Sequence, residues 1–102
     1  SNVVIKVAEA AAWLDSLIER GARYSFAFID HSHSYDAVYE ASRRLRHVLA
    51  EGSFVAFHDY NDPRNFSDNE NYGVFQAANK GLGDAFTFCG GFGCTGLFRL
   101  NA

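Results

Sequence analysis

The chain has 102 residues, 48% of them hydrophobic and 21% charged, which suits one soluble globular domain and is too short for two. The formal net charge of -3 argues against a large binding surface for nucleic acid or for an anionic membrane, and no apolar run reaches the roughly 20 residues that span a bilayer. Because we expect no signal peptide and two cysteines are too few for a disulfide framework, we expect a cytoplasmic protein in which the thiols of Cys89 and Cys94 are reduced.

The first two predicted elements are a helix and a buried strand. Apolar residues recur at helical spacing over residues 4–20, and Gly21 stands where a C-terminal helix cap belongs. Residues 24–29 form an almost continuous apolar run that ends at Asp30. Such a run predicts a strand that is covered on both faces.

A second helix and a second strand repeat this arrangement. The helix is predicted over residues 35–49, with Ser34 or Asp36 as its N-terminal cap. Residues 53–57 form another buried-strand pattern, and this strand ends at His58 and Asp59.

The remainder of the chain predicts a loop, a helix and a hairpin. Residues 61–71 are rich in Asp, Asn and Ser and contain the only Pro, so we expect a long loop of the kind that can form a lid. A short helix is expected over residues 72–82. Residues 85–89 and 95–100 are predicted as two strands, joined by a tight turn at the glycines of residues 90–93.

This order of elements predicts an α/β fold. Helices that alternate with strands favour parallel strands joined by crossover helices, and the final hairpin adds an antiparallel edge. We expect residues 1–102 to form a single domain, with Ser1 and Asn2 as the remnant of a cleaved tag.

Both buried strands end in groups that can bind metals. Because the ligand crevice of an open parallel sheet lies beyond the carboxyl ends of its strands, Asp30, His58 and Asp59 should converge if the two strands are neighbours. Two carboxylates and an imidazole can hold a divalent cation or support general-base catalysis. Oxygen ligands alone would favour Mg²⁺ or Ca²⁺, and an imidazole extends the choice to Mn, Fe or Zn. The alternative is that these residues only cap or end structural elements.

The same residues resemble one group of class I S-adenosylmethionine-dependent methyltransferases. Residues 28–35, FIDHSHSY, are similar to the IDGxHxY motif that follows the fourth strand of that group. Residues 49–60, LAEGSFVAFHDY, are similar to its segment ending in HD at the fifth strand. The group includes sugar and macrolide O-methyltransferases and cephalosporin-hydroxylase-like proteins. The resemblance covers residues 24–100 and implies a partial Rossmann-like sheet.

The resemblance implies a metal centre for a small-molecule substrate. Asp30, His58 and Asp59 would hold Mg²⁺ or another divalent metal, which would lower the pKa of a substrate hydroxyl. His33 would act as the general base or contact the substrate. The metal would thus prepare the hydroxyl for methyl transfer.

Three further residues take their implied roles from the same resemblance. His31 would contact the adenine of S-adenosylmethionine, and Tyr35 and Tyr60 would line the substrate pocket. In these enzymes a glycine-rich loop after the first strand binds the cofactor, and no strand with such a loop precedes Asp30. We therefore expect the C-terminal half of a methyltransferase domain, inactive alone, which either forms a homo-oligomer or lacks its N-terminal half.

Two other functions stay open at this point. The chain could be a non-catalytic α/β binding or interaction module, in which the Asp and His residues are structural. It could also be a metal-dependent hydrolase or oxygenase that uses the Asp and His cluster, with His33 or His31 completing a two-His-one-carboxylate iron site.

Overall fold

One mixed sheet organises the part of the chain that the structure describes. The computed structural model describes residues 2–5, 10–30, 33–67 and 72–102. The strands are β1 (Asn2–Ile5), β2 (Tyr24–Ile29), β3 (Leu49–Phe57), β4 (Phe86–Phe92) and β5 (Thr95–Leu100). Their order in the five-stranded sheet is β1-β2-β3-β5-β4. β1, β2 and β3 are parallel, whereas β5 is antiparallel to both β3 and β4.

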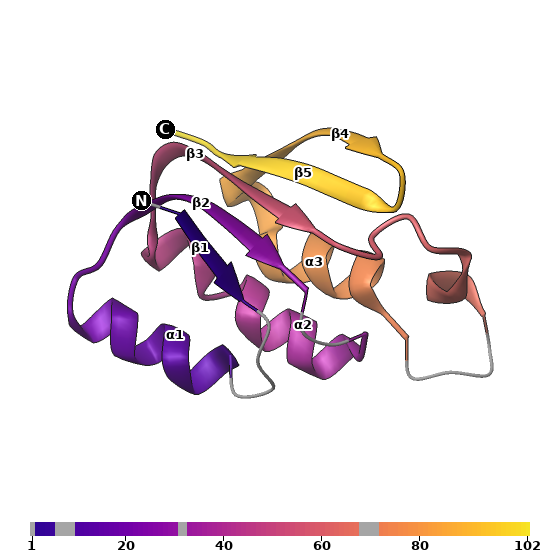
Figure 1. The fold of residues 1–102 in the computed structure, drawn as a ribbon, viewed down its shortest axis with the longest axis horizontal. Helices are drawn as coiled ribbons and strands as arrows, with labels where there is room; N and C mark the ends of the chain where they lie inside the picture. Colours follow the sequence, from indigo (N-terminus) through magenta and orange to yellow (C-terminus); the bar gives the residue numbers. More distant parts are fainter. Residues whose placement is uncertain (1, 6–9, 31–32, 68–71) are drawn as a thin grey trace.

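The α-helices of the described residues lie together on one face of this sheet (Figure 1). They are α1 (Ala10–Glu19), α2 (Tyr35–Ser42) and α3 (Val74–Leu82), and short 3-10 segments span Leu45–His47, Pro63–Phe66 and Gly83–Ala85. α1 and α2 are the crossovers from β1 to β2 and from β2 to β3. The α/β fold with parallel crossovers and a C-terminal antiparallel hairpin is therefore confirmed. Within the described segments, no helix has the length and apolar character needed to cross a membrane.

The hydrophobic core lies between the sheet and these helices. Its largest fully buried apolar side chains come from all three α-helices, from β3 and from the segment between α2 and β3: Leu14, Leu17, Val38, Leu45, Val48, Leu49, Val55, Phe57 and Val74. A neighbouring group of rings under the hairpin contains Tyr60, Phe75, Phe88 and Phe98. This aromatic group accounts for part of the high Phe content of the chain.

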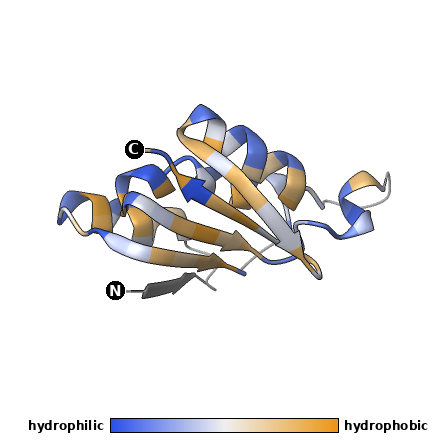
Figure 2. Ribbon diagram, turned by 90° about the horizontal axis from the view of Figure 1, so that it is seen from above, coloured by the Kyte–Doolittle hydropathy of each residue, from blue (hydrophilic) through white to orange (hydrophobic). Residues whose placement is uncertain are grey.

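The prediction that both central strands are covered on both faces is wrong for the described residues. Ala27, Val55 and Phe57 point into the core and are fully buried. Phe28 is only half-buried, and Phe54 is 37% exposed. The reason is that the described helices all lie on the same face of the sheet (Figure 1), although the strands themselves carry many hydrophobic residues (Figure 2).

The N-terminal helix is shorter than predicted, because a strand precedes it. A helix was expected over residues 4–20, but β1 occupies residues 2–5 and α1 begins at Ala10. The residues between them, 6–9, lie outside the described part of the chain. Val3 and Val4 pair in parallel with Ala27 and Phe28. Valine favours a strand where a neighbouring strand is present, and this long-range pairing overrides the local helical periodicity.

The second helix also ends earlier than predicted. Its N-terminus is as expected, because the Ser34 hydroxyl accepts a hydrogen bond from the N–H of Ala37 at 3.3 Å. The helix stops at Ser42 instead of residue 49, and β3 begins at Leu49 instead of residue 53. Leu49 pairs with Tyr24 of β2, so the start of β3 is again decided by a strand partner.

Candidate functional site

The parallel pairing of β2 with β3 brings two polar strand ends together. Ile29 pairs with Phe57, so Asp30 and His58 each directly follow a paired residue. The backbone N–H of His58 extends the ladder by donating to the carbonyl of Ile29 at 3.0 Å. Asp30 and His58 therefore meet at the carboxyl edge of the sheet, as the order of elements predicted.

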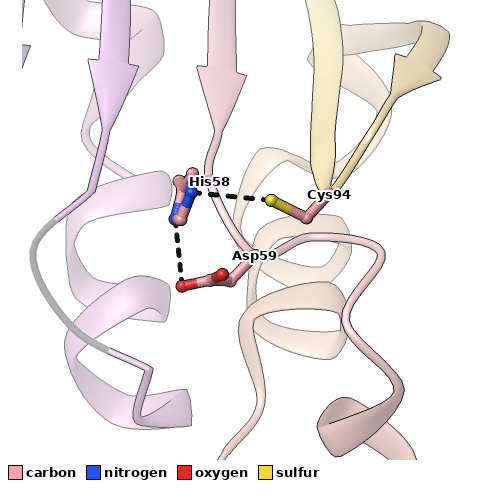
Figure 3. A group of neighbouring side chains, drawn as sticks. All are labelled: His58, Asp59 and Cys94. Carbon is pink, nitrogen blue, oxygen red and sulfur yellow. Dashed lines mark hydrogen bonds and ion pairs between the residues drawn. The ribbon is translucent and has the colours of Figure 1, made fainter.

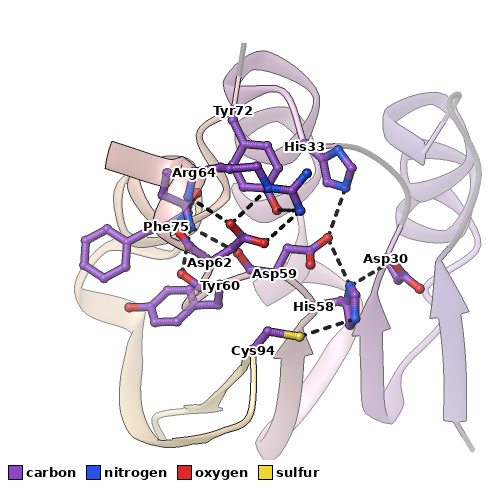
Figure 4. A network of polar contacts seen from close by, with 11 residues as sticks. Asp30, His33, His58, Asp59, Tyr60, Asp62, Arg64, Tyr72, Phe75 and Cys94 are labelled. Atoms are coloured by element: carbon purple, nitrogen blue, oxygen red, sulfur yellow. Dashed lines mark hydrogen bonds and ion pairs between the residues drawn. The ribbon is translucent and has the colours of Figure 1, made fainter. Parts of the chain in front are cut away.

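Four side chains form a polar cluster at this edge: Asp30, His33, His58 and Asp59 (Figure 4). His58 Nδ1 lies 3.1 Å from Asp59 Oδ2 and 3.4 Å from Asp30 Oδ1. His33 Nε2 lies 3.0 Å from the same oxygen of Asp59. The Asp59 side chain is 12% exposed and that of His33 is 53% exposed. Asp59 thus forms the buried centre of the polar cluster, and His33 its solvent side.

Asp59 has a backbone conformation that residues other than glycine rarely adopt. Its φ is 65°, and no other non-glycine residue of the described segments has a positive φ. Such a conformation costs about 1 kcal/mol or more, although Asp tolerates it better than most residues. The buried Asn65 amide supports the turn by donating to the carbonyls of Asp59 and Tyr60, both at 3.0 Å. This turn directs the Asp59 carboxylate toward His33 and His58 (Figure 4).

Cys94 approaches the polar cluster from the turn between β4 and β5 (Figure 3). Its Sγ lies 3.5 Å from Nε2 of His58, on the ring edge opposite the carboxylates. Donor atoms of His58, Asp59 and Cys94 all lie within 4.8 Å of one another. Sequence analysis missed this residue because it treated Cys89 and Cys94 as a pair, whereas Cys89 is exposed. The antiparallel pairing of Phe57 with Gly96 is the signal that places Cys94 beside His58.

An aromatic and charged network supports His33 from the loop side. The His33 ring stacks on Tyr72, with centroids 4.7 Å apart and an interplanar angle of 19°. The Arg64 guanidinium lies 4.7 Å from the centroid of the Tyr72 ring and pairs with Asp62 at 2.8 Å. Burial, reinforced by the negative charges of Asp59 and Asp62, raises the pKa of Tyr72 to about 12. Tyr72 therefore stays neutral at physiological pH and offers a stable stacking surface.

A family model described as a methyltransferase domain matches residues 1–60, which is more than half of the 102 residues. The chain belongs to this methyltransferase domain family. The matched part includes β1 to β3 and all four residues of the polar cluster, whereas Cys94 lies beyond it. No curated protein matches the sequence significantly.

The other predicted site residues of the methyltransferase domain lie in different surroundings. His31 lies outside the described residues. Tyr35 is 37% exposed and stacks on Tyr39 along α2. Tyr60 is only 4% exposed, its ring contacts Phe75, and it belongs to the aromatic group under the hairpin. The structure thus gives Tyr60 a packing role, and the predicted contacts of Tyr35 and Tyr60 with substrate stay predictions.

The donor set of the methyltransferase domain fits a divalent metal. In an octahedral site with bonds of about 2.1 Å, neighbouring ligand atoms lie roughly 3.0 Å apart. The distances from His58 Nδ1 to the oxygens of Asp59 and Asp30, 3.1 and 3.4 Å, are close to this spacing. His58 Nδ1 is also buried and makes no hydrogen bond of suitable geometry with the described residues. A metal ion between the ring and the carboxylates would satisfy this nitrogen.

The described residues do not fit a cradle for S-adenosylmethionine in the same way. Such a cradle needs a glycine-rich loop after a strand. Residues 6–9, between β1 and α1, contain no glycine, and Gly90, Gly91 and Gly93 belong to the hairpin of β4 and β5. We therefore assign no residue of the described segments to the methyl donor.

Proposed function

We propose that this methyltransferase domain is the metal-binding, substrate-facing part of an S-adenosylmethionine-dependent O-methyltransferase. The observation that carries the proposal is the meeting of Asp30, His58 and Asp59 at the ends of two adjacent parallel strands. The family match supports the reaction type. The substrate class is a small molecule with a hydroxyl group, because a metal held by these residues would lower the pKa of such a hydroxyl as a Lewis acid.

His33 is the candidate general base. Its Nε2 faces the Asp59 carboxylate at 3.0 Å, which favours the tautomer with the proton on Nε2. Nδ1 is then the nitrogen that can accept a proton from the substrate hydroxyl. The Asp59 carboxylate would stabilise the imidazolium that forms, and stacking on Tyr72 would hold the ring in place.

Metal-dependent stabilisation tests the first part of this proposal. At a free concentration about 100-fold above its Kd, a bound ion adds about 2.7 kcal/mol of stability, which raises the Tm of a domain of this size by roughly 10–20 °C. Mg²⁺ and Mn²⁺ should stabilise the wild-type chain, and Asp59→Asn or Asp30→Asn should remove the effect. Asp36→Asn, at an exposed position in the first turn of α2, is the matched control and should retain it. No metal effect on the wild type would refute the metal site and favour an interaction module.

Methyl transfer tests the second part. The protein as produced in its native cell is incubated with methyl-labelled S-adenosylmethionine and hydroxyl-bearing acceptors. His33→Gln should lower kcat by about 10²–10⁴-fold while metal binding is retained. Transfer that is unaffected by Asp59→Asn and His33→Gln would contradict the assigned roles. S-adenosylmethionine added to residues 1–102 alone should barely change the Tm, because the described residues lack a donor cradle.

A metal-dependent oxygenase is the second candidate, and one observation favours it. His33 and His58 both approach Oδ2 of Asp59, at 3.0 and 3.1 Å. Two histidines and one carboxylate are the ligands of a two-His-one-carboxylate iron site. Oxygen consumption that requires Fe²⁺ and needs no methyl donor would select this function over methyl transfer.

A further inference from the structure

The turn that carries Cys94 is anchored beside the polar cluster. The backbone N–H of Asn61 donates to the carbonyl of Cys94 at 3.2 Å, and the Asn61 amide donates to the carbonyl of Gly93 at 3.2 Å. Pairing of Phe57 with Gly96 fixes the register of β5 on β3. Together these contacts fix the turn that carries Cys94 and hold its thiol against the residues that follow β3.

The distance between Cys94 and His58 matches one edge of a tetrahedral metal site. With a Zn–S bond of about 2.3 Å and a Zn–N bond of about 2.05 Å at the tetrahedral angle, sulfur and nitrogen lie about 3.5 Å apart. The observed distance from Cys94 Sγ to His58 Nε2 is 3.5 Å. The carboxylate of the buried Asp59 completes a group whose donor atoms lie within 4.8 Å of one another (Figure 3). Binding of one ion by all three residues requires the Asp59 carboxylate to turn from His33 and Nδ1 of His58 toward the Nε2 side of the ring.

The His58 ring therefore has two chemically different edges. Nδ1 faces the oxygens of Asp30 and Asp59, which suit hard ions such as Mg²⁺. Nε2 faces the sulfur of Cys94. Thiolate ligands prefer Zn²⁺ and similar ions over Mg²⁺ and Ca²⁺. Three protein ligands with one open position are the pattern of zinc sites that bind water or substrate.

We propose that His58 Nε2, the Asp59 carboxylate and the Cys94 thiolate form a three-ligand site for Zn²⁺ or a similar borderline ion. Binding releases the thiol proton to solvent. In this arrangement Asp30 is not a ligand, and its carboxylate orients the ring from the Nδ1 side, where it lies 3.4 Å away. The inference deepens the proposed function by naming the metal class. It rests on the same His58 and Asp59, but the two metal modes differ in their need for Cys94 and Asp30.

Cobalt substitution tests the site directly. Co²⁺ in a tetrahedral site with a thiolate ligand gives intense visible bands and a sulfur-to-cobalt charge-transfer band. The wild-type chain should show both with one equivalent of Co²⁺, and Zn²⁺ should remove them. Cys94→Ser should lose the charge-transfer band and bind Zn²⁺ at least roughly 100-fold more weakly, because the loss of a ligand should exceed the 10–100-fold effects of outer-shell changes. Cys89→Ser, which alters the exposed thiol, is the matched control and should behave like the wild type.

The two metal modes can fail separately. Cys94→Ser should retain the stabilisation by Mg²⁺ or Mn²⁺, which also shows that the variant is folded, whereas Asp30→Asn should lose that stabilisation and keep the thiolate band. A wild-type chain without a thiolate–cobalt band overturns the inference and reduces the Cys94–His58 contact to a thiol–imidazole hydrogen bond. Such a result with intact Mg²⁺ or Mn²⁺ binding would leave the proposed function standing. Loss of all metal effects would remove both.

Discussion

Asn65 is the residue whose replacement should disturb the loop after β3 most. Its side chain is 4% exposed and sits in the 3-10 segment Pro63–Phe66. Its amide donates to three backbone carbonyls, at 2.9–3.0 Å, and its carbonyl accepts from the N–H of Phe75 in the first turn of α3 at 3.1 Å. One side chain thus ties the turn at Asp59 to the start of a helix. We consider the variant Asn65→Ala.

The expected loss follows from these contacts. A typical intramolecular hydrogen bond contributes about 1 kcal/mol net, and a buried group left without a partner costs about 1–3 kcal/mol. The two amide hydrogens and the accepted Phe75 N–H amount to roughly three hydrogen bonds, so Asn65→Ala should lower the free energy of unfolding by about 2–4 kcal/mol. For a domain of this size the Tm should fall by roughly 10–25 °C.

Thermal and urea denaturation, followed by circular dichroism, measure this loss. Asn61→Ala is the matched control, since Asn61 is exposed and its amide makes one hydrogen bond within the described part of the chain, to the carbonyl of Gly93. The control should lose less than about 1 kcal/mol. Asn65→Ala should also weaken metal binding, because the Asp59 carbonyl loses its support. Equal stability losses in the two variants would refute the reasoning that Asn65 organises this loop.

Three other predictions concern the surroundings of the site. Because the pKa of Tyr72 is raised to about 12, a near-ultraviolet titration should show one tyrosine ionising near that pH. The stability that the neutral Tyr72 ring contributes should be lost as the pH rises from 10 through 12. Tyr72→Phe should remove both the titration signal and this loss of stability. The Arg64 guanidinium lowers the pKa of Asp62, so this carboxylate contributes stability at neutral pH that is lost as the pH falls through the acid range, and Asp62→Asn should flatten that part of an acid-denaturation profile. Gly96→Ala should lower the free energy of unfolding by about 1–3 kcal/mol in urea denaturation, because its Cβ would clash with the Tyr60 ring. An unchanged midpoint would show that the ring can move away.

Local patterns predicted the elements whose structure is decided locally. Residues 24–29 are a strand as expected, and the hairpin is present, but β4 runs through Gly90 and Gly91 to Phe92, so the turn is at Gly93 and Cys94 and not at all the glycines of residues 90–93. The meeting of Asp30 and His58 was also predictable, because adjacent parallel strands end at the same edge. β1 was not, since a short run of Val and Ile fits a helix or a strand equally well until a partner strand is present.

Cys94 shows why part of the site lay beyond sequence analysis. Along the chain its neighbour is Cys89, and that spacing without a second pair argues against a zinc site made by the two cysteines. In space its partner is His58, which lies 36 positions away in the sequence. Only the register of β5 on β3 makes this contact visible, and register depends on packing across the sheet.

The conformation of Asp59 links the stability of this loop to its chemistry. A glycine would adopt a φ of 65° without strain, but it would leave His33 and His58 without the carboxylate that both approach. Aspartate instead costs about 1 kcal/mol of backbone strain at this position, which the hydrogen bonds of Asn65 offset. Strained residues cluster at binding and catalytic sites, so the backbone conformation of this buried aspartate supports the proposed metal site over a simple strand end. The same backbone turn therefore explains why the carboxylate faces both histidines and why the loop depends on Asn65.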